Sequence, residues 1–129
     1  GLDNADYVFA YGRLRTGFWH QFLLGRRTPV GSGRTSEKYA LYASPFPYVR
    51  MDQPVSPIRG EVYAVNARIL RDMDSLMCCP AWYRRCEVLV VLDNGLQVTA
   101  WMYERRGTGG ILVEAGDLWD RAEAVAEPD

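Results

Sequence analysis

The sequence has few of the residues that build metal and disulfide sites. Its 129 residues include one histidine, His20, and three cysteines, Cys78, Cys79 and Cys86. Three cysteines cannot all pair within one chain, which argues against a disulfide-dense secreted scaffold. Two of the cysteines are adjacent and a second histidine is lacking, so the ligand spacing of a structural zinc site is absent. We therefore expect no metal site.

Long hydrophobic runs and a strong charge bias are also lacking. The longest aliphatic run, residues 88–92, is far shorter than the roughly 20 residues of a membrane-spanning helix. Asp3 and Asp6 lie where a secretion signal carries positive charge. The net charge is -1 and Lys38 is the one lysine, unlike the strongly basic domains that bind nucleic acid. We expect a cytoplasmic protein that contacts no membrane and no nucleic acid, with nucleic-acid binding as a minor alternative.

The composition is typical of one folded domain. Hydrophobic residues make up 48% of the chain and charged residues 24%. Disordered chains have few apolar residues and a large net charge, so this class is excluded. A single domain commonly has about 100–200 residues. We expect one domain over residues 1–129, with residues 1–6 and 121–129 peripheral to it.

Apolar periodicity predicts several strands and one clear helix. The expected strands cover residues 7–11, 58–65, 83–92 and 96–103. Asn94-Gly95, between the last two, favours a β-hairpin turn with positive φ. Four prolines make residues 44–57 a loop or a sheet edge, and residues 117–126 fit a short terminal helix. This content predicts an α+β fold in which a small barrel-like sheet is closed by the helix.

The predicted helix covers residues 66–78. Asn66 suits the N-cap, where its side-chain oxygen accepts a backbone N–H. A stripe of apolar residues marks the inward face and includes Ile69, Leu70, Met73, Leu76 and Met77. Asp74 falls on the opposite, polar face, and Pro80 ends the run.

The turn after the first strand is the most informative candidate site. In Tyr11-Gly12-Arg13-Leu14, the glycine allows successive backbone N–H groups to point toward one carboxylate or phosphate, and Arg13 adds positive charge nearby. The alternative is an ordinary turn. Two other candidates are weaker: a cysteine nucleophile paired with His20 lacks a third orienting group, and residues 107–110 lack the Lys-Ser/Thr of a phosphate loop.

The ordered motifs together resemble the gamma-glutamylcyclotransferase-like family, in its short bacterial type. Residues 7–15, Tyr-Val-Phe-Ala-Tyr-Gly-Arg-Leu-Arg, are similar to the family's opening Val-Phe-Val-Tyr-Gly-Thr-Leu-Arg. Further similar segments follow in order, namely Gly60-Glu61-Val62-Tyr63, Leu70 to Leu76, Pro80, Tyr83-Arg84-Arg85, Ala100-Trp101-Met102-Tyr103 and Gly116-Asp117-Leu118-Trp119. The resemblance covers roughly residues 7–120.

The resemblance implies a compact mixed barrel that binds a small γ-glutamyl or similar acidic ligand without metal or organic cofactor. The backbone N–H groups of Tyr11, Gly12, Arg13 and Leu14 would hold the glutamyl head, and Tyr83 would border its pocket. In the family's reaction the substrate's own α-amine attacks its γ-carbonyl, which releases 5-oxoproline and an amine. One glutamate takes a proton from the ammonium and gives one to the leaving amine.

The sequence departs from the family at this glutamate. The family reads Leu-Glu-Gly-Tyr-Pro at the helix end, whereas residues 76–80 read Leu-Met-Cys-Cys-Pro, which places the glutamate on Met77. A thioether carries no proton. Three interpretations stay open: an inactive ligand-binding or interaction protein, a cyclotransferase whose proton carrier is Glu61 or Glu104 instead, or an alignment shifted toward Asp74.

Overall fold

The computed structural model describes residues 6–11, 28–44 and 46–117. Within them the chain order is β1 (Asp6–Tyr11), β2 (Gly31–Thr35), β3 (Ala40–Ala43), β4 (Tyr48–Arg50), β5 (Arg59–Val65), α1 (Ala67–Leu76), β6 (Arg84–Leu92), β7 (Gln97–Glu104) and β8 (Ile111–Val113). Every strand predicted from the sequence is present within two residues of its expected bounds. Residues 118–126 of the predicted terminal helix lie outside the described residues.

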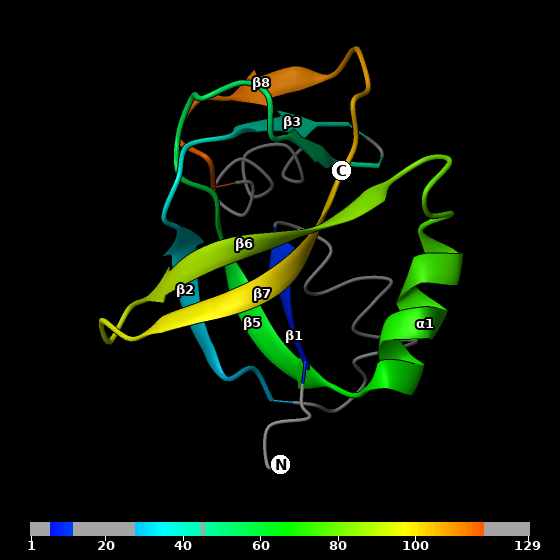
Figure 1. Cartoon of the computed structure of the whole chain (residues 1–129). Helices are drawn as coiled ribbons and strands as arrows, with labels where there is room; N and C mark the ends of the chain where they lie inside the picture. The colour runs from blue at the N-terminus through cyan, green and yellow to red at the C-terminus, as the bar shows by residue number, and fades with distance from the viewer. Residues whose placement is uncertain (1–5, 12–27, 45, 118–129) are drawn as a thin grey trace, which may run out of the picture.

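Five strands form a closed barrel in the order β1-β5-β2-β6-β7. β1 and β7 close the barrel as a parallel pair, with Val8 opposite Trp101, while the other neighbours are antiparallel. The barrel is therefore mixed, and α1 packs beside it (Figure 1). This confirms the α+β class and the small mixed barrel with a helix against it.

A second sheet was not predicted. It has the order β4-β3-β8 and lies at one end of the barrel, above β6 and β7 in Figure 1. β4 is an edge strand, in agreement with the proline-rich loop or edge expected for residues 44–57. β8 was missed because it has three residues, two of them exposed, and directly follows a glycine-rich loop.

The local signals at the start of α1 and at the β6–β7 turn are confirmed. Asn66 caps α1, and its Oδ1 accepts the N–H of Ile69 at 2.8 Å. In the β6–β7 hairpin, Gly95 has a φ of 93°. Asn94 does not share the positive φ; its side-chain oxygen accepts the N–H of Leu96 at 3.0 Å instead. The turn therefore needs glycine at one position only.

Alternate residues of β1 separate two core clusters. Phe9 and Tyr11 pack with residues of β5, β6, β7 and the second sheet. Val8 and Ala10 pack on the other face, under α1. Each cluster buries more than nine residues, so β1 is covered on both sides. The strand that leads into the candidate binding turn is therefore held firmly in place.

Among the described residues, none of the helical segments is long and apolar enough to cross a membrane. The same part of the chain contains no group of three or more histidine, cysteine, aspartate or glutamate residues arranged to hold a metal ion.

Candidate functional site

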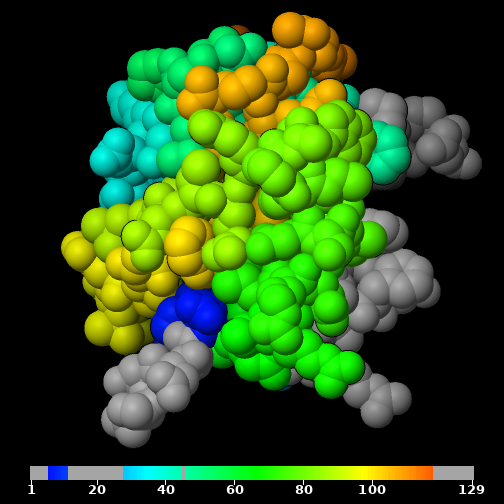
Figure 2. Space-filling view, turned by 45° about the vertical axis from the view of Figure 1, so that its right-hand side comes forward, coloured from blue at the N-terminus to red at the C-terminus, as the bar shows by residue number. Residues whose placement is uncertain are grey.

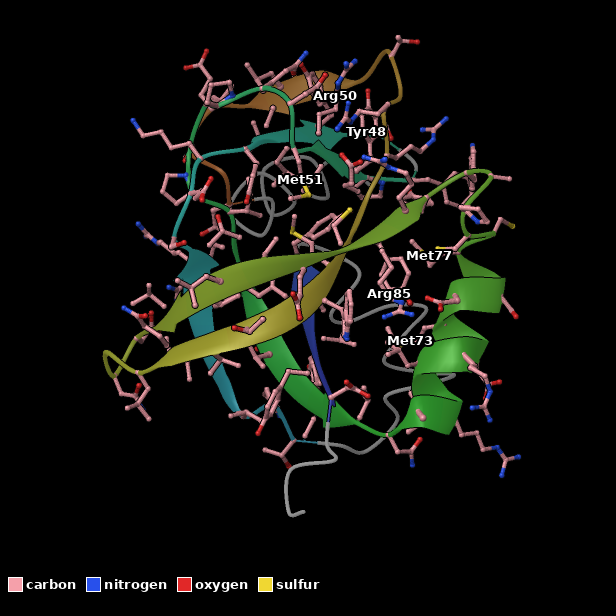
Figure 3. All side chains as sticks on the ribbon, viewed as in Figure 1. Tyr48, Arg50, Met51, Met73, Met77 and Arg85 are labelled. Atoms are coloured by element: carbon pink, nitrogen blue, oxygen red, sulfur yellow. The ribbon has the colours of Figure 1, made fainter. Side chains whose placement is uncertain are left out.

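Met77 lies at the C-terminal end of α1 and points into the protein. It is the C-cap residue, and its N–H donates to Met73 O at 2.9 Å. Its side chain is 6% exposed and packs in the cluster that contains Tyr83 and Tyr103. Figure 3 shows Met77 at the top of α1, above Met73. The apolar stripe therefore correctly predicts the inward position of residue 77, although Leu76 is 37% exposed and lies outside the stripe.

The two cysteines after Met77 differ in their surroundings, since Cys78 is exposed and Cys79 is partly buried. Cys78 is exposed and adopts a φ of 54°, in the left-handed region. Burial raises the pKa of the Cys79 thiol to about 11, so this thiol stays protonated near neutral pH. His20, the partner considered for a cysteine nucleophile, lies outside the described residues.

Asp74, which the sequence places on the polar face of α1, is half-buried and hydrogen-bonded. Its Oδ1 accepts the hydroxyl of Tyr103 at 2.6 Å and Nε of Arg85 at 2.8 Å. The Arg85 guanidinium in turn lies 4.3 Å from the centre of the Trp101 ring. The reason is that β6 and β7 cover this side of the helix and bring their own polar groups to it. Burial, followed by the hydrogen bond to Asp74, raises the pKa of Tyr103, which therefore stays a donor.

Glu61 lies on the helix side of β5. Its register partner on β1 is Ala10, and its Oε1 accepts the Tyr63 hydroxyl at 3.0 Å. Ala10 and Tyr63 both belong to the cluster that buries Met77. The sequence alone left the face of Glu61 open, because strand alternation gives two faces without saying which one meets the helix.

Glu104 is a buried anion in an arginine network. Its side chain is fully buried, and it accepts Nε of Arg84 at 2.9 Å, Nε of Arg106 at 3.0 Å and the N–H of Met51 at 3.1 Å. Burial acts to raise the pKa of Glu104, but the hydrogen bonds from these arginines outweigh it and the pKa is lowered. A carboxylate held charged in this way is a poor proton carrier near neutral pH.

Tyr11 and Tyr83 are core residues at the edges of this region. Tyr11 ends β1 opposite Gly60, is fully buried, and donates its hydroxyl to Tyr103 O at 2.9 Å. Tyr83 is 2% exposed and donates to Pro47 O at 3.1 Å. Tyr83 and Met77 share one core cluster, whereas the Tyr11 ring belongs to the other. Gly12, Arg13 and Leu14 lie outside the described residues.

The sequence missed the Asp74–Tyr103–Arg85 network. Asp74 is 29 residues from Tyr103 and 11 from Arg85, and local periodicity carries no signal for such a contact. Chemically, the described region offers buried tyrosine hydroxyls and two carboxylates, Asp74 and Glu61, around an apolar residue 77. Figure 2 brings the helix side forward, where green atoms of α1 and of the segment after it cover this face, with the orange β8 region above.

Comparisons with known proteins agree with one another. The family described as "Gamma-glutamyl cyclotransferase, AIG2-like" matches residues 8–121. A Methanocaldococcus jannaschii protein provisionally named gamma-glutamylcyclotransferase is 45% identical over 116 residues, covering 89% of this chain and 97% of its own. The human gamma-glutamylaminecyclotransferase is 36% identical over 95 residues, covering 66% of this chain and 61% of its own.

Solved structures show the same fold. An uncharacterized protein from Pyrococcus horikoshii superposes with a TM-score of 0.72 at 22% identity, over 95% of this chain and 97% of its own. A mouse AIG2-like protein superposes with a TM-score of 0.68 at 24% identity, over 82% of this chain and 80% of its own.

Proposed function

This chain belongs to the gamma-glutamyl cyclotransferase, AIG2-like family, and on that premise we propose that it binds a γ-glutamyl group but cyclises it poorly. The glutamyl head would be held by the backbone N–H groups of Tyr11, Gly12, Arg13 and Leu14, where β1 ends. Tyr83 would border the bound group. The fully buried Tyr11 supports this assignment because it fixes the last residue of β1, directly before Gly12.

The family's reaction needs a proton carrier beside the leaving amine. The α-amine of the glutamyl group attacks the γ-carbonyl carbon, the new C–N bond closes the five-membered ring, and the bond to the leaving amine breaks. The attacking ammonium loses two protons as it becomes the lactam N–H, and the leaving nitrogen gains two as it becomes a free ammonium, so the step is proton-neutral overall. A single carboxyl group near residue 77 could carry protons from the first nitrogen to the second.

The observation that carries the proposal is the burial of Met77. Its side chain is 6% exposed and lies among tyrosines and apolar residues. The family resemblance assigns the glutamate to this position. A thioether cannot accept or donate a proton. Loss of a general acid–base group costs about 10²–10⁴-fold in rate, or roughly 3–5 kcal/mol of barrier. Contacts to the glutamyl head do not depend on this proton, so binding would survive.

The test is 5-oxoproline release from a panel of γ-glutamyl compounds by the wild-type protein and by Met77→Glu. We expect Met77→Glu to exceed wild type by about 10²-fold or more. Met77→Gln is the matched control, since it has a similar size and polarity but no titratable proton. Equal rates of 5-oxoproline release by wild type and by Met77→Glu would contradict the loss of the proton carrier at residue 77. This holds whatever the rate of Met77→Gln.

A specific observation favours a second candidate, an active cyclotransferase that uses Glu61. Glu61 faces the side of β5 that is packed against the Met77 cluster, and it accepts the hydroxyl of Tyr63 from within that cluster. α1 runs back along the barrel from the end of β5 (Figure 1). Ten helical residues rise about 15 Å, while four strand residues from Val65 to Glu61 span about 13 Å, so Glu61 is roughly level with the helix end.

The two candidates differ in the effect of Glu61→Gln. If wild type releases 5-oxoproline and Glu61→Gln lowers the rate about 10²-fold without changing ligand affinity, the proton carrier is Glu61. The other outcome is that wild type binds the ligand without turnover. If Glu61→Gln, added to Met77→Glu, then leaves the activity of Met77→Glu intact, the chain is a binding protein.

A further inference from the structure

Arg105 presents a guanidinium that is held between two aromatic rings. It directly follows β7, and its Cζ lies 4.7 Å from the centre of the Trp82 ring and 5.3 Å from that of Tyr48. Its N–H donates to Val49 O at 2.9 Å, which also fixes the backbone. A guanidinium stacked in this way is positioned before any ligand arrives, so binding would cost little additional side-chain entropy.

Arg105 differs from the arginines around it because it is not neutralised by a carboxylate. Arg50 pairs with Asp52 at 2.8 Å, and Arg106 pairs with Glu104 at 3.0 Å. Arg84 also pairs with Glu104. Within residues 6–11, 28–44 and 46–117, no aspartate or glutamate oxygen lies within 4.0 Å of the Arg105 guanidinium. The planar donor fork of arginine matches a carboxylate in a bidentate manner, and here that fork is available.

Arg105 lies next to the proposed γ-glutamyl site. Tyr48, on which it stacks, belongs to the same core cluster as Met77 and Tyr83. In Figure 3 Tyr48, on β4 of the second sheet, lies above Met77 at the end of α1. β1 and β7 are parallel neighbours, so their C-terminal ends lie at one edge of the barrel. Val8 lies opposite Trp101, and each strand ends three residues further on, at Tyr11 and at Glu104. The two strand ends are therefore level, and Arg105 directly follows.

This edge is open to solvent. Trp82 is 43% exposed, and Phe46 meets its ring edge-on at 5.7 Å between ring centres. The rings of Trp82 and Phe46 form a small platform with Arg105. This platform has an apolar surface and one positive charge that no described carboxylate pairs with. Such a surface suits a small organic group that carries a carboxylate.

We propose that Arg105 binds a free carboxylate on the leaving-amine side of the substrate. The preferred ligands are then γ-glutamyl amino acids rather than γ-glutamyl alkylamines. This inference rests on the proposed function, because it assumes that the γ-glutamyl group is bound at the end of β1. In this proposal the glutamyl head is held where β1 ends, and the second carboxylate reaches Arg105, which directly follows β7 at the same edge of the barrel.

The test compares two ligands that differ only in this carboxylate, γ-glutamylalanine and γ-glutamylalaninamide, by calorimetric titration of the full chain. We expect wild type to bind γ-glutamylalanine about tenfold more tightly, as one charge-assisted pair at a half-exposed site would give. Arg105→Gln should abolish this preference and leave γ-glutamylalaninamide binding unchanged. Arg71→Gln is the matched control, since Arg71 is an exposed arginine on α1 away from the platform, and it should behave as wild type.

A second variant guards against a folding defect in Arg105→Gln. Trp82→Leu keeps the charge but removes one ring that positions it, so we expect the tenfold preference to fall severalfold while the thermal unfolding of the variant stays cooperative. Equal binding of both ligands by wild type would overturn the role of Arg105 and leave γ-glutamyl binding standing. Failure of wild type to bind either ligand would overturn both proposals. A loss of affinity for both ligands in Arg105→Gln would also contradict a carboxylate-specific role.

Discussion

At the scale of single residues, Cys78 carries the clearest backbone strain. It is a non-glycine residue with a φ of 54°, directly after the C-cap of α1. Helices commonly end with a residue in this left-handed conformation, and glycine adopts it without steric cost. The family pattern given in the sequence analysis has glycine at this point, where cysteine stands in this chain.

We predict that Cys78→Gly stabilises the protein by about 0.5–1 kcal/mol, because it removes the left-handed penalty of a residue with a Cβ. The measurement is the free energy of unfolding from urea titration under reducing conditions. The matched control is Ser75→Gly, an exposed position inside α1, where the same residue should destabilise by about 0.5–1 kcal/mol. A Cys78→Gly variant that is less stable than wild type would contradict the strain at this position.

At the scale of elements, α1 is joined to the barrel through Asp74. Tyr103 on β7 and Arg85 on β6 both donate to this one carboxylate oxygen. Since the helix carries Met77 at its end, the network also sets the depth at which residue 77 enters the protein. If a glutamate is introduced at position 77, even a small displacement of the helix end would misplace its carboxylate for proton transfer.

We predict that Tyr103→Phe lowers the free energy of unfolding by about 1–3 kcal/mol, since it removes a hydrogen bond to a charged, half-buried acceptor. The effect should be strongly coupled to Asp74→Asn in a double-mutant cycle, because both changes break the same contact. Tyr7→Phe, at a half-buried tyrosine of β1, serves as the control and should change the stability by less than about 0.5 kcal/mol.

The same network decides how well Met77→Glu works. We predict that Tyr103→Phe, added to Met77→Glu, reduces 5-oxoproline release more than it reduces ligand affinity. The reason is that a loosened α1 misplaces the new carboxylate without touching the glutamyl head. The comparison of kcat with KM for the single and double variants checks this. A pure increase in KM with unchanged kcat would show that the network acts on binding instead.

At the scale of the whole molecule, Glu104 joins the barrel to the second sheet. It belongs to β7 and faces Arg84 of β6 across the hairpin, while the N–H of Met51, next to β4, donates to it at 3.1 Å. The adjacent Arg105 N–H donates to Val49 of β4 at 2.9 Å. These contacts hold the two sheets together, and with them the edge at which Arg105 and Tyr48 meet.

Glu104 predicts a pH dependence of stability. Its pKa is lowered in the folded protein from an ordinary value of 4.5. The unfolded chain therefore binds the proton more readily, and the contribution to stability is fully present above about pH 4.5 and is lost as the pH falls through the lower, folded pKa. We expect Glu104→Gln to be less stable than wild type at pH 7, and the difference to shrink below pH 4.5. Urea titrations between pH 3 and pH 7 measure it; a difference that is constant with pH would contradict the prediction.

Some features of this protein depend only on neighbouring residues, and the sequence by itself determined them. Asn66 caps α1 because its side chain reaches an N–H three residues ahead, and Gly95 turns the hairpin because it alone tolerates a positive φ there. The strand runs and the buried position of Met77 follow from periodicity, which is a property of short segments. The order of the motifs likewise sufficed for the family.

Other features were decided by the tertiary structure, because they depend on groups that are distant along the chain. Asp74 lies in a polar position of an amphipathic helix, and only the approach of Tyr103 and Arg85 makes it half-buried and hydrogen-bonded. β8 is too short to be distinguished by its own pattern and exists as a strand because β3 pairs with it. Arg105 has no local mark in the sequence; its position between two rings follows from the meeting of β7, β4 and the segment before β6. In each case the partner, and not the residue, determines the role.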